Sequence, residues 1–228
     1  MIAIDYNSIS PAEAIALQQK LRDKIQLTPL GRPVSTIGGA DISFNKYSEI
    51  VYAGIIVLSY PDLKPLAEST IVSSTKFPYI PGLLGFREVP ALAEAWNKLS
   101  LKPDILMLDG QGIAHPRRMG IATHFGLITG ISTIGCAKSL LTGKYEEPLD
   151  LSGATSALVD KGEVIGTVLR TKRKCKPVFI SPGNLITLEE SVDIVKNCVR
   201  TYRIPEPTRL AHLLVNRVRI EASDNRLF

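Results

Sequence analysis

Three segments early in the chain carry the dense or alternating apolar pattern of β-strands. Short connections rich in turn-forming residues join them, as in an antiparallel meander. The predicted strands span residues 37–44, 51–59 and 66–74. A helix is expected before them, because Ser10, Pro11 and Glu13 form the pattern of a capping box and apolar residues follow at helical spacing. These apolar residues are Ala14, Leu17, Leu21 and Ile25.

Helix and strand patterns alternate in the middle of the chain. A loop rich in proline and glycine, residues 77–85, leads to a predicted helix from Arg87 to Leu99. A strand at 105–108, a helix at 121–128 and a strand at 132–135 follow. Three antiparallel strands and two crossover units predict an α/β fold, in which helices flank both faces of a mixed sheet with antiparallel and then parallel strands.

The last third of the chain adds a hairpin, a short strand and two helices. Residues 160–163 separate two strand patterns and predict the hairpin turn. A strand is expected at 178–180, and a second capping box at 187–190 begins a helix. The final helix is expected to turn three leucines inward, Leu210, Leu213 and Leu214.

The composition narrows the class of protein. The chain has 228 residues, is 45% hydrophobic and shows no repeat or boundary, so residues 1–228 are expected to form one catalytic domain. Its net charge of +5 allows a polyanionic partner without requiring one. The three cysteines lack a C-x-x-C spacing, which argues against a disulfide framework and a structural zinc site. With no signal peptide and no apolar run of ~20 residues, the protein is expected to be soluble and cytoplasmic.

Three carboxylates lie where a predicted strand or helix meets a loop. Asp41 lies inside an apolar run, Asp109 ends the strand at 105–108, and Glu88 opens the helix after the proline-rich loop. A carboxylate at the end of a buried strand is costly unless it is paired, and three of them favour a hard cation such as Mg²⁺. For a single aspartate, a helix cap or a turn is the better interpretation. A basic protein that gathers acids around a metal is typical of a metal-dependent nuclease.

The segment from Asp109 to Arg118 contains a second cluster of residues that could bind a ligand or take part in catalysis. Its glycines let the backbone approach a ligand, His115 could bind a phosphate or relay a proton, and Arg117 and Arg118 could meet backbone phosphates. The alternative for the two arginines is a solvated face. The Gly110-Gln111-Gly112 run is only a weak match to a dinucleotide-binding fingerprint.

Four further features have two interpretations each. Pro78-Tyr79-Ile80-Pro81-Gly82 is either a rigid wedge for nucleic-acid bases or a turn with Tyr79 packed on the core. Lys138 either offsets charge at a phosphate or lies on the surface. His212 either completes a metal shell or is structural. The basic run at 172–176 is either a phosphate-binding rail or a solvated surface.

These motifs, in this order, resemble the endonuclease V family. The matching segments are 39–44, 77–84, 86–88, 109–118, 133–138 and 203–212, so the resemblance covers nearly the whole chain. It implies a ribonuclease H-like fold and Mg²⁺, with Mn²⁺ as a substitute. It also implies that Asp41 and Asp109 are the principal metal ligands and that Glu88 and His212 complete the site. His115 and Lys138 would serve the phosphate or the water.

The resemblance further implies a reaction and a substrate. The family nicks one strand at the second phosphodiester bond 3′ to deoxyinosine and leaves 3′-hydroxyl and 5′-phosphate ends. The expected partner is DNA with deoxyinosine or other deaminated or mispaired bases, bound by a monomer. The alternatives are the same chemistry on inosine-containing RNA and a non-catalytic nucleic-acid-binding module. The expected DNA contacts are Tyr79, Pro78, Ile80, Pro81, Arg117 and Arg118. Candidates for the base pocket are Gly82, Leu84, Gly110, Gly112, Gly120 and Gly135.

Overall fold

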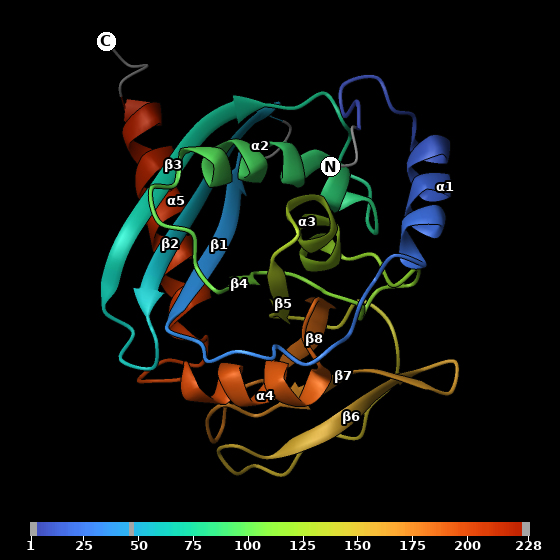
Figure 1. Ribbon diagram of the computed structural model, residues 1–228, viewed down its shortest axis with the longest axis vertical. Helices are drawn as coiled ribbons and strands as arrows, with labels where there is room; N and C mark the ends of the chain where they lie inside the picture. Colours follow the sequence, from blue (N-terminus) through green and yellow to red (C-terminus); the bar gives the residue numbers. More distant parts are fainter. Residues whose placement is uncertain (1–3, 46–47, 225–228) are drawn as a thin grey trace.

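The computed structural model describes residues 4–45 and 48–224, which contain one eight-stranded sheet in the order β3-β2-β1-β4-β5-β8-β7-β6 (Figure 1). The first three strands, β1 (Thr36–Phe44), β2 (Ile50–Ser59) and β3 (Pro65–Ser74), pair antiparallel as the predicted meander. Next to β1 lie β4 (Ile105–Leu108) and β5 (Ser132–Ala137), both parallel to it. The mixed α/β sheet predicted from the element order is confirmed.

Three antiparallel strands extend the sheet beyond β5. They are β8 (Val178–Asn184), β7 (Glu163–Leu169) and β6 (Thr155–Asp160). The β6–β7 turn forms at the predicted tetrapeptide, where Lys161 and Gly162 both have positive φ, 54° and 81°. Two consecutive residues of this kind match the right-handed twist of the flanking strands, as in a type I′ hairpin.

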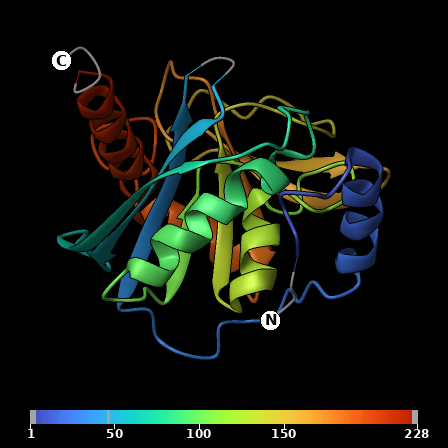
Figure 2. The same cartoon turned by 90° about the horizontal axis from the view of Figure 1, so that it is seen from above.

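Helices cover both faces of the sheet. On one face lie α2 (Leu84–Lys98) and α3 (Ile121–Thr129), and on the other lie α4 (Leu188–Asn197) and α5 (Glu206–Asp224) (Figure 2). The strand pleat divides the core between them: Leu106 and Leu108 pack toward α2 and α3, whereas Ile105 and Met107 pack toward α4 and α5. No helix within the described ranges is long and apolar enough to cross a membrane.

Three helices test the predictions made from local pattern. The first, α1 (Pro11–Arg22), has the predicted capping box at Ser10 and Glu13. The start predicted for α2 was wrong by three residues, because Leu83 caps the helix without a side-chain hydrogen bond and so leaves no sequence signal. In α5 the prediction for Leu213 was wrong: its side chain is 53% exposed, while Ala211, Leu214 and Val215 are buried.

Candidate active site

Asp41 and Asp109 lie side by side at the same edge of the sheet. Their strands are parallel neighbours in which Ala40 pairs with Leu108, and each aspartate is the next residue. The Asp109 amide donates to the Ala40 carbonyl at 3.1 Å, so the backbone fixes this register beyond the end of β4. The two carboxylates therefore meet at one point, where Asp109 follows the end of β4 and Asp41 lies within the longer β1.

His212 reaches the same point from α5. Its Nδ1 lies 2.7 Å from Oδ2 of Asp41, and its Nε2 lies 3.0 Å from the side-chain amide of Asn216. The hydroxyl of Ser43 donates to the amide oxygen of Asn216 at 3.2 Å, which orients the amide nitrogen toward the imidazole. Asn216 lies one helical turn after His212, so a spacing of four residues on a helix was the sequence signal that the analysis missed.

These three side chains form a donor set that fits a divalent ion. One ligand atom from each of Asp41, Asp109 and His212 lies within 4.8 Å of the others. Burial and the repulsion of Asp109 raise the pKa of Asp41 to about 6, although the bond from His212 opposes the shift. Carboxylate oxygens suit Mg²⁺ and Mn²⁺, and one imidazole is compatible with Mn²⁺. A cation at this position would relieve the repulsion between the two aspartates.

Glu88 lies on the fifth residue of α2 and lines the same cavity, but it falls outside this set of three. Burial raises its pKa to about 8, and the charges of Asp41 and Asp109 add to the shift. The neighbouring Arg87 opposes the shift. Its guanidinium donates instead to the carbonyls of Phe77 and Ser48, at 2.8 and 2.7 Å. Glu88 is therefore an acid that carries its proton near neutral pH until a cation lowers its pKa.

Lys138 follows β5, the strand beyond β4, and its ammonium pairs with Asp109. Asp41, Asp109 and Lys138 thus lie on or just after three neighbouring strands, β1, β4 and β5. The Lys138 side chain is 39% exposed, so it can turn toward a ligand in the cavity. An ammonium beside the acid cluster is placed to offset the charge of a phosphate.

A cavity of about 420 Å³ connects the acids with the proline-rich loop. Tyr79 stands at its rim with 59% of the residue exposed, and its ring lies 5.9 Å from that of Phe44 at the end of β1. Phe77 and Leu83, which flank the loop, are buried, and Ile80 packs against them. Pro78 and Pro81 are exposed. The loop is therefore anchored at both ends and presents its aromatic ring outward.

The Gly82 carbonyl is the fixed point of this loop. It accepts from His115 Nε2 at 3.0 Å, from the Arg117 guanidinium at 2.8 Å and from the Gln18 amide at 3.0 Å. His115 Nδ1 accepts the Arg117 backbone amide at 3.1 Å, which places the ring proton on Nε2. Burial lowers the pKa of His115 to about 4, so the ring is neutral.

His115 and Arg117 therefore position the proline-rich loop at 77–85 through their own side chains. Both ring nitrogens of His115 are occupied, which gives no support to a phosphate contact from this residue. Arg117 also donates through Nε to the side-chain oxygen of Gln18 at 2.5 Å. Gln18 was missed by the sequence analysis, although a polar residue on the inward face of α1 between Ala14 and Leu21 was a visible signal.

Arg118 has a different role from the predicted phosphate contact. It donates to Asp160 at 2.9 Å and to Glu163 at 2.8 Å, and its side chain is only 7% exposed. This guanidinium attaches the β6–β7 hairpin to the loop after β4. A side chain committed to two carboxylates leaves no face for DNA, so the proposed DNA surface no longer includes Arg118.

The candidate pocket residues divide into two groups. The cavity is lined by Gly82, Leu84, Gly110 and Gly120. Gly112 and Gly135 are not among the residues that line it. A Cβ on Gly112 would lie 2.2 Å from the Pro182 carbonyl oxygen, and one on Gly135 would lie 2.2 Å from the Gly112 nitrogen. These two glycines serve close packing of backbone segments rather than contact with a base.

Comparison with known proteins agrees with this geometry. The family model for endonuclease V matches residues 19–213. Endonuclease V of Myxococcus xanthus (strain DK1622) is 47% identical over 212 residues, covering 92% of this chain and 90% of the relative. The solved endonuclease V of Streptomyces avermitilis has a TM-score of 0.89 at 37% identity, with 95% and 96% of the two chains covered.

A third comparison includes a nucleic acid. Endonuclease V of Ciona intestinalis was solved in complex with a 24mer DNA containing an inosine followed by a ribo-adenosine. It has a TM-score of 0.81 at 30% identity, with 92% of this chain and 98% of that chain covered. From the match over most of its length and the shared ribonuclease H-like sheet, the chain belongs to the endonuclease V family of nucleases.

Proposed function

We propose that this protein is a Mg²⁺-dependent endonuclease that nicks a strand at the second phosphodiester bond 3′ to deoxyinosine. One observation carries the proposal: Asp41, Asp109 and His212 converge at one point, and the two aspartates line a cavity that Tyr79 also lines. The inosine-containing DNA bound by the Ciona relative supports the choice of substrate. The active form is proposed to be a monomer.

Each side chain of the site has a proposed role in phosphodiester hydrolysis. Asp41, Asp109 and His212, with Glu88 facing the same cavity, would hold the ion. A divalent ion supplies Lewis acidity for phosphodiester hydrolysis by in-line attack of water. Once the ion lowers the pKa of Glu88, its ionised carboxylate would be placed to take a proton from the attacking water. Lys138 offsets charge on the phosphate, and the products carry 3′-hydroxyl and 5′-phosphate ends with no covalent protein intermediate.

The residues that line the cavity support a hypothesis for the choice of base. Hypoxanthine lacks the 2-amino group of guanine and the 6-amino group of adenine. The backbone at Gly82, Gly110 and Gly120 would approach the base closely, and Leu84 would form an apolar wall against the extra amine of guanine. Tyr79 would stack beside the vacated position. Unpaired or mispaired bases leave the stack more cheaply, which adds to the selection.

The test is cleavage of a duplex with a single deoxyinosine, with and without Mg²⁺, with the nick mapped to the nucleotide. Asp109→Asn should abolish nicking and leave DNA binding largely intact, because it removes ligand charge and no phosphate contact. Asp193→Asn, an exposed aspartate on α4, is the matched control and should cut normally. Normal nicking by the Asp109 variant would refute the metal assignment.

A second candidate substrate is inosine-containing RNA. The same site could act on it, and the DNA in the Ciona complex carries a ribonucleotide after its inosine. Side-by-side cleavage of matched DNA and RNA strands decides between the two substrates. Binding of both in EDTA, with no cleavage of either after Mg²⁺ is added, would instead support a non-catalytic binding module.

A further inference from the structure

A second hollow, of about 690 Å³, adjoins the catalytic cavity. The two share Lys138, Ser139 and Leu140. From there the second hollow runs over Phe179 of β8 to Arg170, the residue after β7. We call it the exit groove. It is therefore continuous with the end of the active site at which Lys138 pairs with Asp109.

The strand order places the exit groove opposite the wedge. Along the sheet edge the strands run β1, β4, β5, β8 and β7. Tyr79 contacts Phe44 at the β1 end, Asp41 and Asp109 follow, and Lys138 comes next. The exit groove continues over β8 and β7. A nucleic-acid strand that contacts Tyr79 first and then passes Asp41 and Asp109 would next enter this groove.

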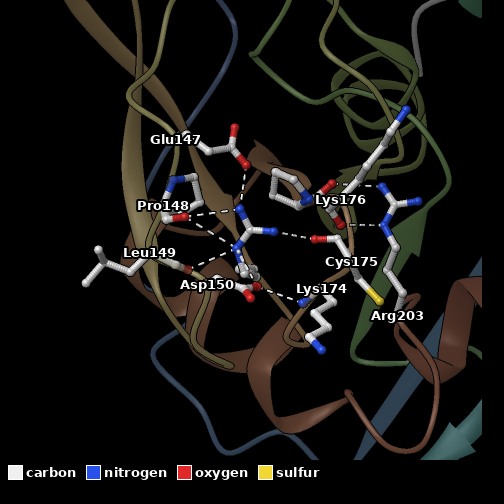
Figure 3. Close-up of polar contacts among 10 residues, drawn as sticks. Glu147, Pro148, Leu149, Asp150, Lys174, Cys175, Lys176 and Arg203 are labelled. Atoms are coloured by element: carbon white, nitrogen blue, oxygen red, sulfur yellow. Dashed lines mark hydrogen bonds and ion pairs between the residues drawn. The ribbon is translucent and has the colours of Figure 1, made fainter.

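Two arginines hold the loop that forms one wall of the groove (Figure 3). Arg170 is 8% exposed, and its guanidinium donates to the Leu149 carbonyl at 2.9 Å, to Glu147 at 2.5 Å and to the Cys175 carbonyl. Arg203 donates to the Lys176 carbonyl at 2.6 Å and to the Lys138 carbonyl at 2.9 Å. The basic loop is therefore tied directly to the residue beside the acid cluster.

The charges left over in the groove are positive. Its two carboxylates already have partners: Glu147 pairs with Arg170, and Asp150 accepts the Lys174 backbone amide at 2.7 Å. Lys174 and Lys176 are exposed, and within residues 4–45 and 48–224 neither ammonium has a hydrogen bond or ion pair. Figure 3 shows both side chains extending away from the Arg170 network. A rigid loop thus presents two unpaired cations at the mouth of the active site.

We propose that the exit groove binds backbone phosphates of the substrate strand on the 3′ side of the cut, through Lys174 and Lys176. The inference rests on the proposed function, since the cut lies 3′ to a base held beside Tyr79. Phosphate oxygens match free ammonium groups, and a loop fixed before binding loses little entropy when it makes these contacts. Such contacts carry no sequence information, as the groove of a lesion-directed enzyme requires.

The test is equilibrium binding in EDTA, so that no strand is cut. The variant is Lys174→Gln/Lys176→Gln, and the substrate is a duplex with a long 3′ flank. Each lost phosphate contact should lower the affinity by up to about eightfold at ~0.1 M salt. The slope of log affinity against log salt should fall by about 1.8 for the pair. When the strand is shortened to end just beyond the cut, the difference from the parent protein should shrink to within about twofold. Shortening the 5′ flank should leave the difference unchanged.

The matched control is Lys64→Gln/Lys98→Gln, which removes the same charge from two exposed lysines. Lys64 precedes β3 near the start of β1, and Lys98 ends α2, both away from Asp41. The control should keep the parent salt slope and affinity. Equal losses in both variants, or a loss that follows the 5′ flank, would overturn the proposal.

The outcomes also separate this proposal from the proposed function. If the parent protein binds and nicks the duplex while the Lys174/Lys176 variant binds it equally well, only the exit groove fails. If the parent protein neither binds nor cuts inosine-containing strands, the proposed function fails. Thermal unfolding of both variants checks the fold. The fold of the Lys174/Lys176 variant should be unaffected, because neither of these two ammonium groups has a partner within the described ranges.

Discussion

Replacing Glu88 with glutamine should stabilise the metal-free protein, and the gain should grow with pH. Burial and the charges of Asp41 and Asp109 raise the pKa of Glu88 from 4.5 to about 8. Between these values the folded protein holds a proton that the unfolded chain has released. A group of this kind makes the folded state less stable as the pH rises from about 4.5 to 8, with no further loss above that range.

The size of the effect follows from the shift. At 1.36 kcal/mol per pKa unit, the full shift corresponds to roughly 5 kcal/mol of destabilisation above about pH 8. Glu88 is only partly buried, so solvent screening reduces this value. We therefore expect Glu88→Gln to gain about 2–3 kcal/mol at alkaline pH and little below about pH 5.

Urea unfolding in EDTA, in acidic and alkaline buffers, measures this difference. Glu94→Gln, at an exposed position on the same helix, is the control and should show no gain that depends on pH. Adding Mg²⁺ should cancel most of this gain, because a bound ligand stabilises by about 2.7 kcal/mol at a hundredfold excess over Kd and Glu88→Gln weakens the site. A pH-independent difference between the parent protein and Glu88→Gln would show that Glu88 is not held as a strained acid.

Three other substitutions test separate parts of the site. Tyr79→Ala should lower affinity for the deoxyinosine duplex by about 1–3 kcal/mol in a binding titration and leave Tm unchanged, because the residue is 59% exposed; equal lesion preference would make Tyr79 merely structural. Arg118→Met should lower the free energy of unfolding by about 2 kcal/mol, since it leaves Asp160 and Glu163 unpaired, and should not change the salt slope of DNA binding; a shallower slope would restore its predicted phosphate contact. Asn216→Ala should raise the Mg²⁺ concentration needed for half-maximal nicking by roughly tenfold, because His212 loses the partner that orients it; an unchanged requirement would mean that His212 is held by Asp41 alone.

The position of the two aspartates could be predicted from sequence because strand connectivity determines it. Once residues 37–44 and 105–108 are parallel neighbours, Asp109 at the end of the second strand can lie beside Asp41 within the first. The same reasoning placed Lys138 at the next strand. His212 lies 171 positions from Asp41, and its match to the family pattern was the signal that brought it into the site.

Contacts between segments that are distant in the sequence could not be predicted from the local residue pattern. Arg118 meets carboxylates 42 and 45 residues away, and nothing in the local sequence distinguishes such an arginine from one that binds phosphate. His115 was likewise assigned to a ligand when its ring holds a backbone carbonyl. Leu213 was placed by helical spacing alone, whereas α5 contacts β1 and β2 along a stripe one residue away. In each case the partner's position, and not the residue's own neighbours, decides the role.

The three donors on the Gly82 carbonyl have a consequence for how the enzyme searches a duplex. An oxygen with two lone pairs that already receives His115, Arg117 and Gln18 has no capacity left, so the loop that carries Tyr79 is held in place before any encounter. Under the proposed function, the DNA would then supply the movement that brings a base out, and a weakened base pair would be distinguished from a sound one by how often it opens.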